Sequence, residues 1–512
     1  MTASGVGIII GAGIYVLLGP ATAEAGGAVW MSFALAGGLS AFTALSYAEL
    51  ASMYPSAGAE YEYTRHVAPE WVAFQVGWMM ILGLVIAAGA VSLGFAGYFH
   101  HFVALPEQAV ALGLLVLTGG IATLGIRRAA RVTVALSLLQ VAGLIAVIAV
   151  GVPRFGDHDL LSGATPGGVL AGAALVFFAF IGFDEVITLS AETRDPYRTV
   201  PRALLVALAI STVLYMAVGF AAVSVLGSGS LARSSTPLAD VMRNAMGSAS
   251  ADVMAVAAMI ATINTTLLVI TAASRLTWSM ASTGSLPSGL QKLNRRSVPG
   301  RGIALAVGVA AAFVMVGRIS LVASVTDFAV FLVFIAVNVA VIVLRFRQPN
   351  HRRPFRVPGN IGRVPLPAVG ALAAVAAVVP SLEPAAIGLG SLVVIAGAVA
   401  YRLMRRRRSA PETIPGDLDP MTRRTQVDKS EARRVADILA VDFDAVEFDL
   451  TQFHRGLRRE LQHGRADPDT NVTDDDLVLT AKIVLAHLNE IPDYYTRLEV
   501  MEADAIEDWK RR

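Results

Sequence analysis

Long apolar segments separated by short polar ones fill the first 400 residues of the chain. A helix that crosses the hydrocarbon core of a bilayer needs roughly 20 predominantly apolar residues. Twelve segments approach or reach this length, at about residues 5–26, 28–54, 71–99, 107–125, 131–151, 165–191, 202–226, 251–279, 302–318, 320–344, 364–381 and 383–403; the ninth and the last two are short. The pattern predicts an all-α membrane protein with about 12 transmembrane helices.

The composition fits a protein whose main solvent is lipid. Hydrophobic residues make up 55% and charged residues 16% of the chain, whereas soluble domains average about 25% charged. The absence of cysteine excludes disulfides, thiolate metal sites and cysteine nucleophiles. The first apolar segment begins almost at Met1 without a basic region before it, so we expect a transmembrane helix rather than a cleaved signal peptide. Its closeness to Met1 indicates a late start or a shortened chain.

Lysine and arginine gather on alternate loops. If the N-terminus is cytoplasmic, the inner loops hold 22 of these residues, and the outer loops hold only Arg154, Arg233, Arg243 and Arg318. Cytoplasmic loops carry the excess of positive charge. The asymmetry therefore predicts an even number of spans with both termini in the cytoplasm, in a bacterial-type inner membrane.

The character of the chain changes after the last apolar segment. We expect a transmembrane domain over residues 1–408, a polar linker over 409–428 and a small helical cytoplasmic domain over 429–512. In this last part apolar residues recur at helical spacing, for example at Ala432, Val435 and Leu439.

The first apolar segment contains the sequence Gly11-Ala12-Gly13. Each glycine weakens a helix by about 0.5–1 kcal/mol relative to alanine. One interpretation is a break in the helix. The other, favoured when the motif is taken alone, is a small-residue packing face, because Gly7 and Gly11 also form a Gly-x-x-x-Gly pair.

The sixth segment favours breaks. Gly182 precedes Asp184 and Glu185 inside an otherwise apolar helix, where ionisable groups are expensive and usually face a cavity. Two interrupted helices at corresponding positions, five spans apart, are typical of inverted-repeat transporters. N–H groups freed at a half-helix bind an anion, and freed carbonyls accept hydrogen bonds from an ammonium group. The two breaks therefore predict a site for a small zwitterion such as an amino acid.

Motifs spread over residues 5–403 resemble those of the amino acid–polyamine–organocation superfamily of permeases. They include G-A-G-I at 11–14, F-A-F-I-G-F-D at 178–184, Y-A-E-L at 47–50 and A-S-R at 273–275. The resemblance implies a five-plus-five inverted repeat with broken helices one and six, followed by two further helices. It also implies transport of amino acids by alternating access, as a secondary active transporter or an exchanger.

The resemblance further implies a substrate site at the two breaks. The backbone N–H groups of Ala12, Gly13 and Ile14 would hold the substrate carboxylate. The carbonyls of Ile9, Phe178 and Ile181 would hold its amino group. Phe178 or Phe180 would form an aromatic gate, with plain helix packing as the alternative for each ring. Gly11 and Gly182 belong to the breaks themselves. Asp184 could bind a basic side chain of the substrate, but the favoured role is local, capping a half-helix or bonding freed backbone.

Two departures from related permeases favour a neutral substrate. Gln140 occupies a position in the fifth helix where permeases resembling cationic amino-acid transporters tend to carry a lysine, and a neutral amide cannot titrate. The third helix has no embedded acid over Trp78–Gly83. We expect an amino-acid substrate and membrane lipid as partners, and the coupling ion, a proton or sodium, is left open.

A few other polar residues lie in the spans: Gln75, Asn264, Arg275, Asp327 and Asn338. Hydrogen bonds between helices explain most of them. Arg275 has two interpretations. It forms a gate with Glu49 or Glu192, or its side chain snorkels to the membrane–water interface, and snorkelling is favoured.

The C-terminal part contains two Glu and His pairs at i, i+3 spacing, Glu460 with His463 and His487 with Glu490. Such pairs on two helices are part of the ligand set of di-metal carboxylate bundles. Surface ion pairs and caps are the favoured interpretation, because the additional Glu ligands are not evident. Residues 463–498 resemble a small uncharacterised bacterial and phage domain family, which leaves a regulator, a partner-binding module and a fused cargo as alternatives.

We expect no enzyme activity, no cofactor and no nucleic-acid partner, and the sequence does not specify the oligomeric state. The principal alternative to transport is a non-transporting membrane sensor, in which a permease-like body signals through residues 429–512. An enzyme in the C-terminal part is a third hypothesis.

Overall fold

The computed structural model describes residues 7, 9–54, 59–125, 129–183, 196–351, 353–409, 427–439, 441–444, 446–466 and 477–511. The chain divides into two compact units, Met1–Ala410 and Pro411–Arg512. The finer limits expected for the linker, at 408 and 428, stay predictions.

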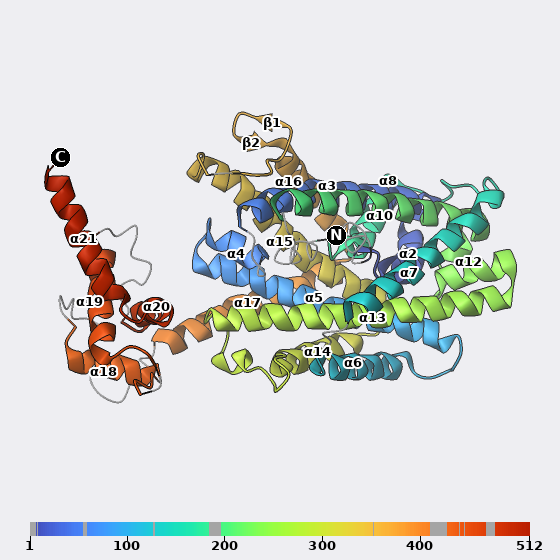
Figure 1. Ribbon diagram of the computed structural model, residues 1–512. Coiled ribbons are helices and arrows are strands. Elements are labelled where there is room, and N and C mark those ends of the chain that lie inside the picture. The colour runs from blue at the N-terminus through green and yellow to red at the C-terminus, as the bar shows by residue number, and fades with distance from the viewer. Residues whose placement is uncertain are drawn as a thin grey trace. The chain divides into compact units, whose positions relative to one another are not determined.

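Long helices run side by side through the first unit (Figure 1). They are α2 (Gly13–Ala25), α3 (Val29–Met53), α5 (Glu70–His100), α6 (Glu107–Thr123), α7 (Ala129–Gly151), α8 (Pro166–Val176), α10 (Pro196–Leu226), α13 (Ser248–Ser282), α14 (Gly300–Val314), α15 (Ile319–Arg347), α16 (Leu366–Val378) and α17 (Pro384–Ser409). The short helices are α4 (Ala59–Arg65), α11 (Ser228–Leu231) and α12 (Pro237–Met246), and the 3₁₀ turns are η1 (Gly26–Ala28), η2 (Val152–Arg154), η3 (Phe177–Phe180), η5 (Ser288–Gln291) and η6 (Val379–Ser381). A small hairpin pairs β1 (Asn360–Ile361) antiparallel with β2 (Val364–Pro365).

Among the described residues, 7 helical stretches are long and apolar enough to cross a membrane, and the first of them joins α2, η1 and α3. Four shorter apolar helices lie at Glu107–Thr123, Pro166–Phe180, Gly300–Val314 and Leu366–Ser381. The predicted helical membrane architecture is confirmed. The number of 12 spans and the five-plus-five repeat stay predictions.

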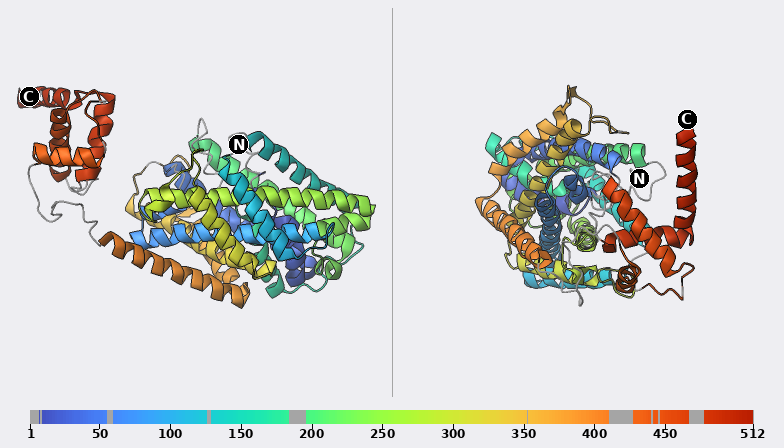
Figure 2. Two further views of the ribbon diagram at one scale, coloured as in Figure 1. Left: turned by 90° about the horizontal axis from the view of Figure 1, so that it is seen from below. Right: turned by 90° about the vertical axis from the view of Figure 1, so that its left-hand side faces the viewer.

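Helix α5 lies deep in the first unit, with 94% of its most apolar window buried. It carries no charged residue between Glu70 and His100, and a helix that is apolar all round is buried on every side. Helices α13 and α15 pack along α5, and α10 packs along α3. Figure 2 shows α13 and α5 running beside each other.

The second unit has a hydrophobic core of its own. Its helices are α18 (Lys429–Ile438), α19 (Leu450–Ala466), α20 (Leu477–Glu490) and α21 (Tyr494–Arg511). The carboxylate of Asp428 caps α18 by accepting a hydrogen bond from the N–H of Glu431 at 2.8 Å. The core contains Ala432, Val435, Phe453, Leu457, Ala481, Val484, Leu488 and Tyr495, so the helical spacing seen in the sequence marks buried faces.

Candidate functional site

The first apolar segment is interrupted where its glycines lie. Residues 10–12 form bends and a turn rather than helix, and α2 begins at Gly13. The preceding residue, Ala12, has no side chain that can cap the helix. The N–H groups of Gly13 and Ile14 belong to the first turn, which has no acceptor inside the helix. The amide of Ala12 itself donates to Thr265 Oγ1 on α13, at 3.0 Å.

The sixth segment is interrupted as well. Helix α8 ends at Val176 and tightens into the 3₁₀ turn η3, after which Ile181 is extended with ψ 134°. Gly182 then adopts φ 112°, a conformation that residues with a Cβ rarely reach. The predicted break in this segment is present, and residues 184–195 lie outside the described part of the chain.

The two breaks touch each other. A Cβ placed on Gly13 would lie 2.5 Å from the Cα of Ala179, so glycine allows the two backbones to approach. The hydroxyl of Tyr215, on α10, lies 2.9 Å from the carbonyl oxygen of Ile9 and 3.1 Å from that of Ala179. Tyr215 therefore links both breaks, a role that its place in an apolar segment did not reveal.

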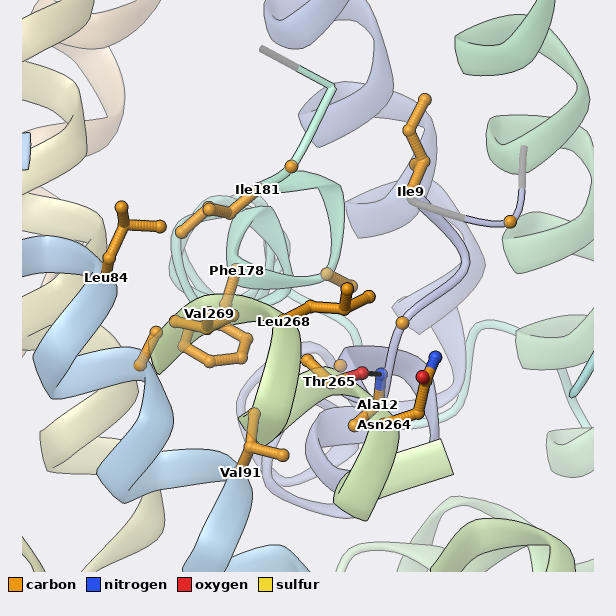
Figure 3. Close-up of a pocket in the computed structure, with 16 residues that line it drawn as sticks. Ile9, Ala12, Leu84, Val91, Phe178, Ile181, Asn264, Thr265, Leu268 and Val269 are labelled. Atoms are coloured by element: carbon orange, nitrogen blue, oxygen red, sulfur yellow. Dashed lines mark hydrogen bonds between the residues drawn. The ribbon is translucent and has the colours of Figure 1, made fainter. Parts of the chain in front are cut away.

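A cavity of about 60 Å³ lies between the breaks, which is room for several water molecules. Its walls are formed by Gly7, Ile9, Gly11, Ala12, Gly13, Phe178, Ala179, Ile181 and Gly182 from the interrupted segments, Leu84, Ala87 and Val91 from α5, and Asn264, Thr265, Leu268 and Val269 from α13. Figure 3 shows the side chains of Leu84, Val91, Leu268 and Val269 around this space, together with the Ala12–Thr265 hydrogen bond. None of the lining residues carries a charged side chain.

Seven of the predicted substrate-site residues line this cavity: Ile9, Gly11, Ala12, Gly13, Phe178, Ile181 and Gly182. Two others do not. Ile14 is buried in α2, and the ring of Phe180 packs edge-on against Tyr215, with centroids 5.2 Å apart. Asp184 lies outside the described residues. The helix-packing interpretation thus fits Phe180, whereas Phe178 lines the cavity and its role as a gate stays a prediction.

Gln140 lies beside the first break without lining the cavity. Its side chain is buried, and neither end of its amide has a hydrogen-bond partner among the described residues. Its backbone carbonyl accepts a hydrogen bond of 2.6 Å from the hydroxyl of Tyr15. One turn earlier on α7, Ser137 Oγ donates to the carbonyl of Gly7 at 3.3 Å. Helix α7 therefore supports the interrupted segment from outside the cavity.

Interhelical hydrogen bonds explain two other polar residues of the spans, as expected. Gln75 Nε2 donates to the carbonyl of Val394 at 3.0 Å. Asn338 Oδ1 accepts from Ser46 Oγ at 2.7 Å. Asp327 is different, because both of its carboxyl oxygens are buried without a hydrogen-bond partner among the described residues.

The structure does not bring Arg275 and Glu49 together as a gate, the less favoured alternative to snorkelling of Arg275. Arg275 is exposed, whereas Glu49 is buried and forms ion pairs with Arg345 and Arg353. Both partners come from positions about 300 residues further along the chain, so local sequence gave no signal for them. The alternative partner, Glu192, lies outside the described residues.

In the second unit, two of the weak metal candidates approach each other. Glu460 Oε1 lies 3.4 Å from His487 Nδ1 and accepts a hydrogen bond of 2.8 Å from the hydroxyl of Tyr495. Glu490 is exposed at the end of α20, and the side chain of His463 lies outside the described part. The described residues include no group of three or more His, Cys, Asp or Glu that could hold a metal. Where the side chains are described, the contacts match the ion-pair interpretation.

Comparison with known proteins identifies the larger unit. The family described as amino acid permease matches residues 1–400. This chain belongs to the amino acid permease family. The permease is 30% identical to the branched-chain amino acid permease of Bacillus subtilis over 387 residues, which cover 70% of the chain and 82% of that relative.

Other relatives of the permease differ in their named roles. An uncharacterized transporter of Mycobacterium tuberculosis is 32% identical over 424 residues, or 81% of the chain and 92% of the relative. The vacuolar cationic amino acid transporter 4 of Arabidopsis thaliana is 32% identical over 381 residues, which cover 68% of the chain and 63% of that relative. Residues 432–504 match a family of unknown function, DUF5661. The protein is thus an integral membrane transporter of the amino acid permease type rather than an enzyme.

Proposed function

We propose that this permease carries neutral amino acids with apolar side chains across the membrane by alternating access. The observation that supports this most directly is the cavity between the two helix breaks, which has backbone groups of both breaks and apolar side chains in its walls. The proposal includes both termini in the cytoplasm, which the asymmetry in loop charge supports, and a location in a bacterial-type inner membrane.

The backbone groups at the breaks suit a zwitterion. The substrate carboxylate would lie at the N-terminus of α2, where the N–H groups of Gly13 and Ile14 and the helix dipole favour a negative charge. The ammonium group would donate to the carbonyls of Ile9, Phe178 or Ile181, residues that line the cavity at the two breaks. Both charges of the substrate are then met without a charged side chain.

The walls of the cavity favour a neutral substrate. Leu84, Val91 and Leu268 are apolar, and no lining residue could neutralise a charged side chain. Burying an unpaired charge costs several kcal/mol or more, which would disfavour arginine and lysine. The named substrates of the Bacillus relative, branched-chain amino acids, fit such a wall better than those of the cationic Arabidopsis relative.

Alternating access would act through the interrupted segments. In our proposal the extended Ile181 and the positive φ of Gly182 form a hinge in the sixth segment. Tyr215 ties this hinge to the first break, so that the two segments move together.

Counterflow in liposomes tests the proposed function. The purified permease is reconstituted with a high internal concentration of one unlabelled amino acid, and entry of the same labelled amino acid is followed. We expect counterflow with leucine, isoleucine or valine and none with arginine or lysine. Counterflow restricted to basic amino acids would overturn the neutral assignment. Absence of counterflow with every amino acid would favour the sensor hypothesis.

A further inference from the structure

Asp327 is a fully buried acid in α15 that takes no part in the cavity described above. Its exposed fraction is 0%, and neither carboxyl oxygen has a hydrogen-bond partner among the described residues. Interhelical hydrogen bonding, which accounts for Gln75 and Asn338, therefore does not account for Asp327. An ionisable group inside a membrane helix is expensive and by default indicates a function.

The helix that carries Asp327 offers no counter-charge near it. The nearest basic residues on this stretch of chain are Arg318, which directly precedes α15, and Arg345, near its end. They lie nine and 18 residues from Asp327, respectively. A rise of 1.5 Å per residue places them about 14 Å and about 27 Å away along the axis. Each already has an acidic partner, because Arg318 pairs with Glu383 at 2.9 Å and Arg345 pairs with Glu49.

The elements that pack against α15 do not supply a counter-charge either. They are α3, α4, α5, α8, α16, α17, η3 and β2. Their charged residues are Glu49, Glu60, Glu62, Arg65, Glu70, His100, Arg402 and Arg405–Arg408, and their tyrosines are Tyr47, Tyr61, Tyr63, Tyr98 and Tyr401. In the described structure no basic group of this set reaches Asp327 within ion-pair distance. The carboxyl group is thus buried without a hydrogen-bond or ion-pair partner among the described residues.

These surroundings suit a proton and not a metal cation. A sodium ion in a transporter is held by several oxygens, including carbonyls of unwound helices. Asp327 lies inside a continuous helix, and its oxygens have no polar partner in the part of the chain that the structure describes. A proton needs one oxygen only, and it removes the charge that makes the site unfavourable.

We propose that Asp327 is the proton-carrying group of this permease. The proposal rests on the proposed transport function. In each cycle one carboxylate oxygen takes a proton from a hydronium ion that enters from the side of higher proton concentration, so that an O–H bond of the hydronium breaks as the carboxyl O–H bond forms. The carboxyl group later gives the same proton to a water molecule on the other side, which becomes hydronium as the carboxyl O–H bond breaks. The substrate and the proton then move in the same direction, and a proton gradient drives accumulation of the amino acid.

A ring contact leads from the helix that carries Asp327 towards the substrate cavity. Phe331 lies one helical turn after Asp327, on the same face of α15. Its ring packs against Phe177, with centroids 4.5 Å apart. Phe177 begins η3, and the next residue, Phe178, lines the cavity. A change in the charge of Asp327 that shifts α15 would therefore reach the sixth-segment break through two touching rings.

Proteoliposomes with a pH-sensitive dye inside test this role. The membrane potential is clamped with potassium and valinomycin, and a proton gradient is imposed inward. For the wild type we expect labelled leucine to accumulate above the external concentration, and addition of leucine to bring protons in. Asp327→Asn is expected to lose both effects while keeping counterflow within about two-fold of wild type. Asp327→Glu, which keeps a carboxyl group, is expected to retain leucine accumulation, proton entry and counterflow.

The matched control is Asp252→Asn, which removes an exposed carboxylate near the start of α13 and is expected to behave as wild type. Accumulation by Asp327→Asn at the wild-type level would overturn the proposal. So would a wild type that shows counterflow without proton entry, a result that does not depend on any variant folding. Loss of proton entry in Asp184→Asn or Glu185→Gln, with Asp327→Asn unaffected, would move the role to the sixth segment. Absence of counterflow in the wild type would instead contradict the proposed function.

Discussion

Arg345 and Glu49 form a buried ion pair between the ends of α15 and α3, with Arg345 Nε 2.9 Å from Glu49 Oε1. The same carboxylate accepts hydrogen bonds from Arg353 Nε at 3.2 Å and from the N–H of Val357 at 2.8 Å. Arg345 also donates to Asn360 in the β1–β2 hairpin. One carboxylate therefore holds together two helices and the chain that leads from α15 into the hairpin.

We expect Glu49→Gln to destabilise the first unit. The substitution leaves two guanidinium groups without a counter-charge, and removing one partner of a buried pair costs about 3–5 kcal/mol. The midpoint of thermal unfolding in detergent should fall clearly. Arg347→Gln is the control on the same helix as Arg345, because Arg347 is exposed and donates to the carbonyl of Val67 rather than to an acid among the described residues. Equal shifts for the two variants would contradict the role assigned to Glu49.

Gly13→Ala is expected to impair transport by separating the two breaks. The added Cβ would lie 2.5 Å from the Cα of Ala179, so the backbone of the sixth segment must move. Overpacking of this kind costs about 1–3 kcal/mol of folding stability, and we expect a several-fold loss of leucine affinity because residues of both breaks line the cavity. The measurement is leucine affinity from counterflow.

Gly38→Ala is the matched control for Gly13→Ala. Gly38 lies in the middle of α3, and a Cβ there would meet nothing within 4 Å. Wild-type counterflow is expected for this variant. If both glycine variants bind leucine equally well, close approach at Gly13 is not what shapes the site.

Thr265→Val should weaken substrate binding, and Thr265→Ser should not. Valine has the shape of threonine but no acceptor, so the amide of Ala12 loses its 3.0 Å hydrogen bond. A buried donor left without an acceptor costs about 1–3 kcal/mol. We expect a several-fold higher half-saturation concentration for leucine with valine at this position. The same change in both variants would mean that the hydroxyl is not what holds the first break.

The sequence predicted the interrupted segments but not the walls of the cavity between them. Gly11, Gly13 and Gly182 are conspicuous because glycine is unusual where an apolar helix is expected, and all three line the cavity. Thr265 and Tyr215 were not found, because in helices that are apolar on every side no periodicity shows which face meets the site. Their roles depend on helix packing across the unit, between residues far apart in the chain.

The C-terminal unit allows a test by pH, because Tyr495 connects two of its helices. Its hydroxyl donates to Glu460 Oε1 at 2.8 Å and lies 3.0 Å from His487 Nδ1. Burial, and next the hydrogen bond to Glu460, raise the pKa of Tyr495 above its ordinary value. Below about pH 10 the phenol is protonated in both the folded and the unfolded chain, so it adds no pH dependence there.

Above about pH 10 the unfolded chain loses this proton and the folded chain keeps it, so the free energy of unfolding should fall as the pH rises. Tyr495→Phe removes the group and should therefore show a shallower fall between pH 9 and about pH 11. At pH 7 the same variant should be less stable by about 1 kcal/mol, because Glu460 loses a donor. Urea unfolding of a fragment spanning residues 427–512, followed by circular dichroism, measures both effects. A variant with the wild-type slope would show that Tyr495 ionises as easily folded as unfolded, against the contact with Glu460.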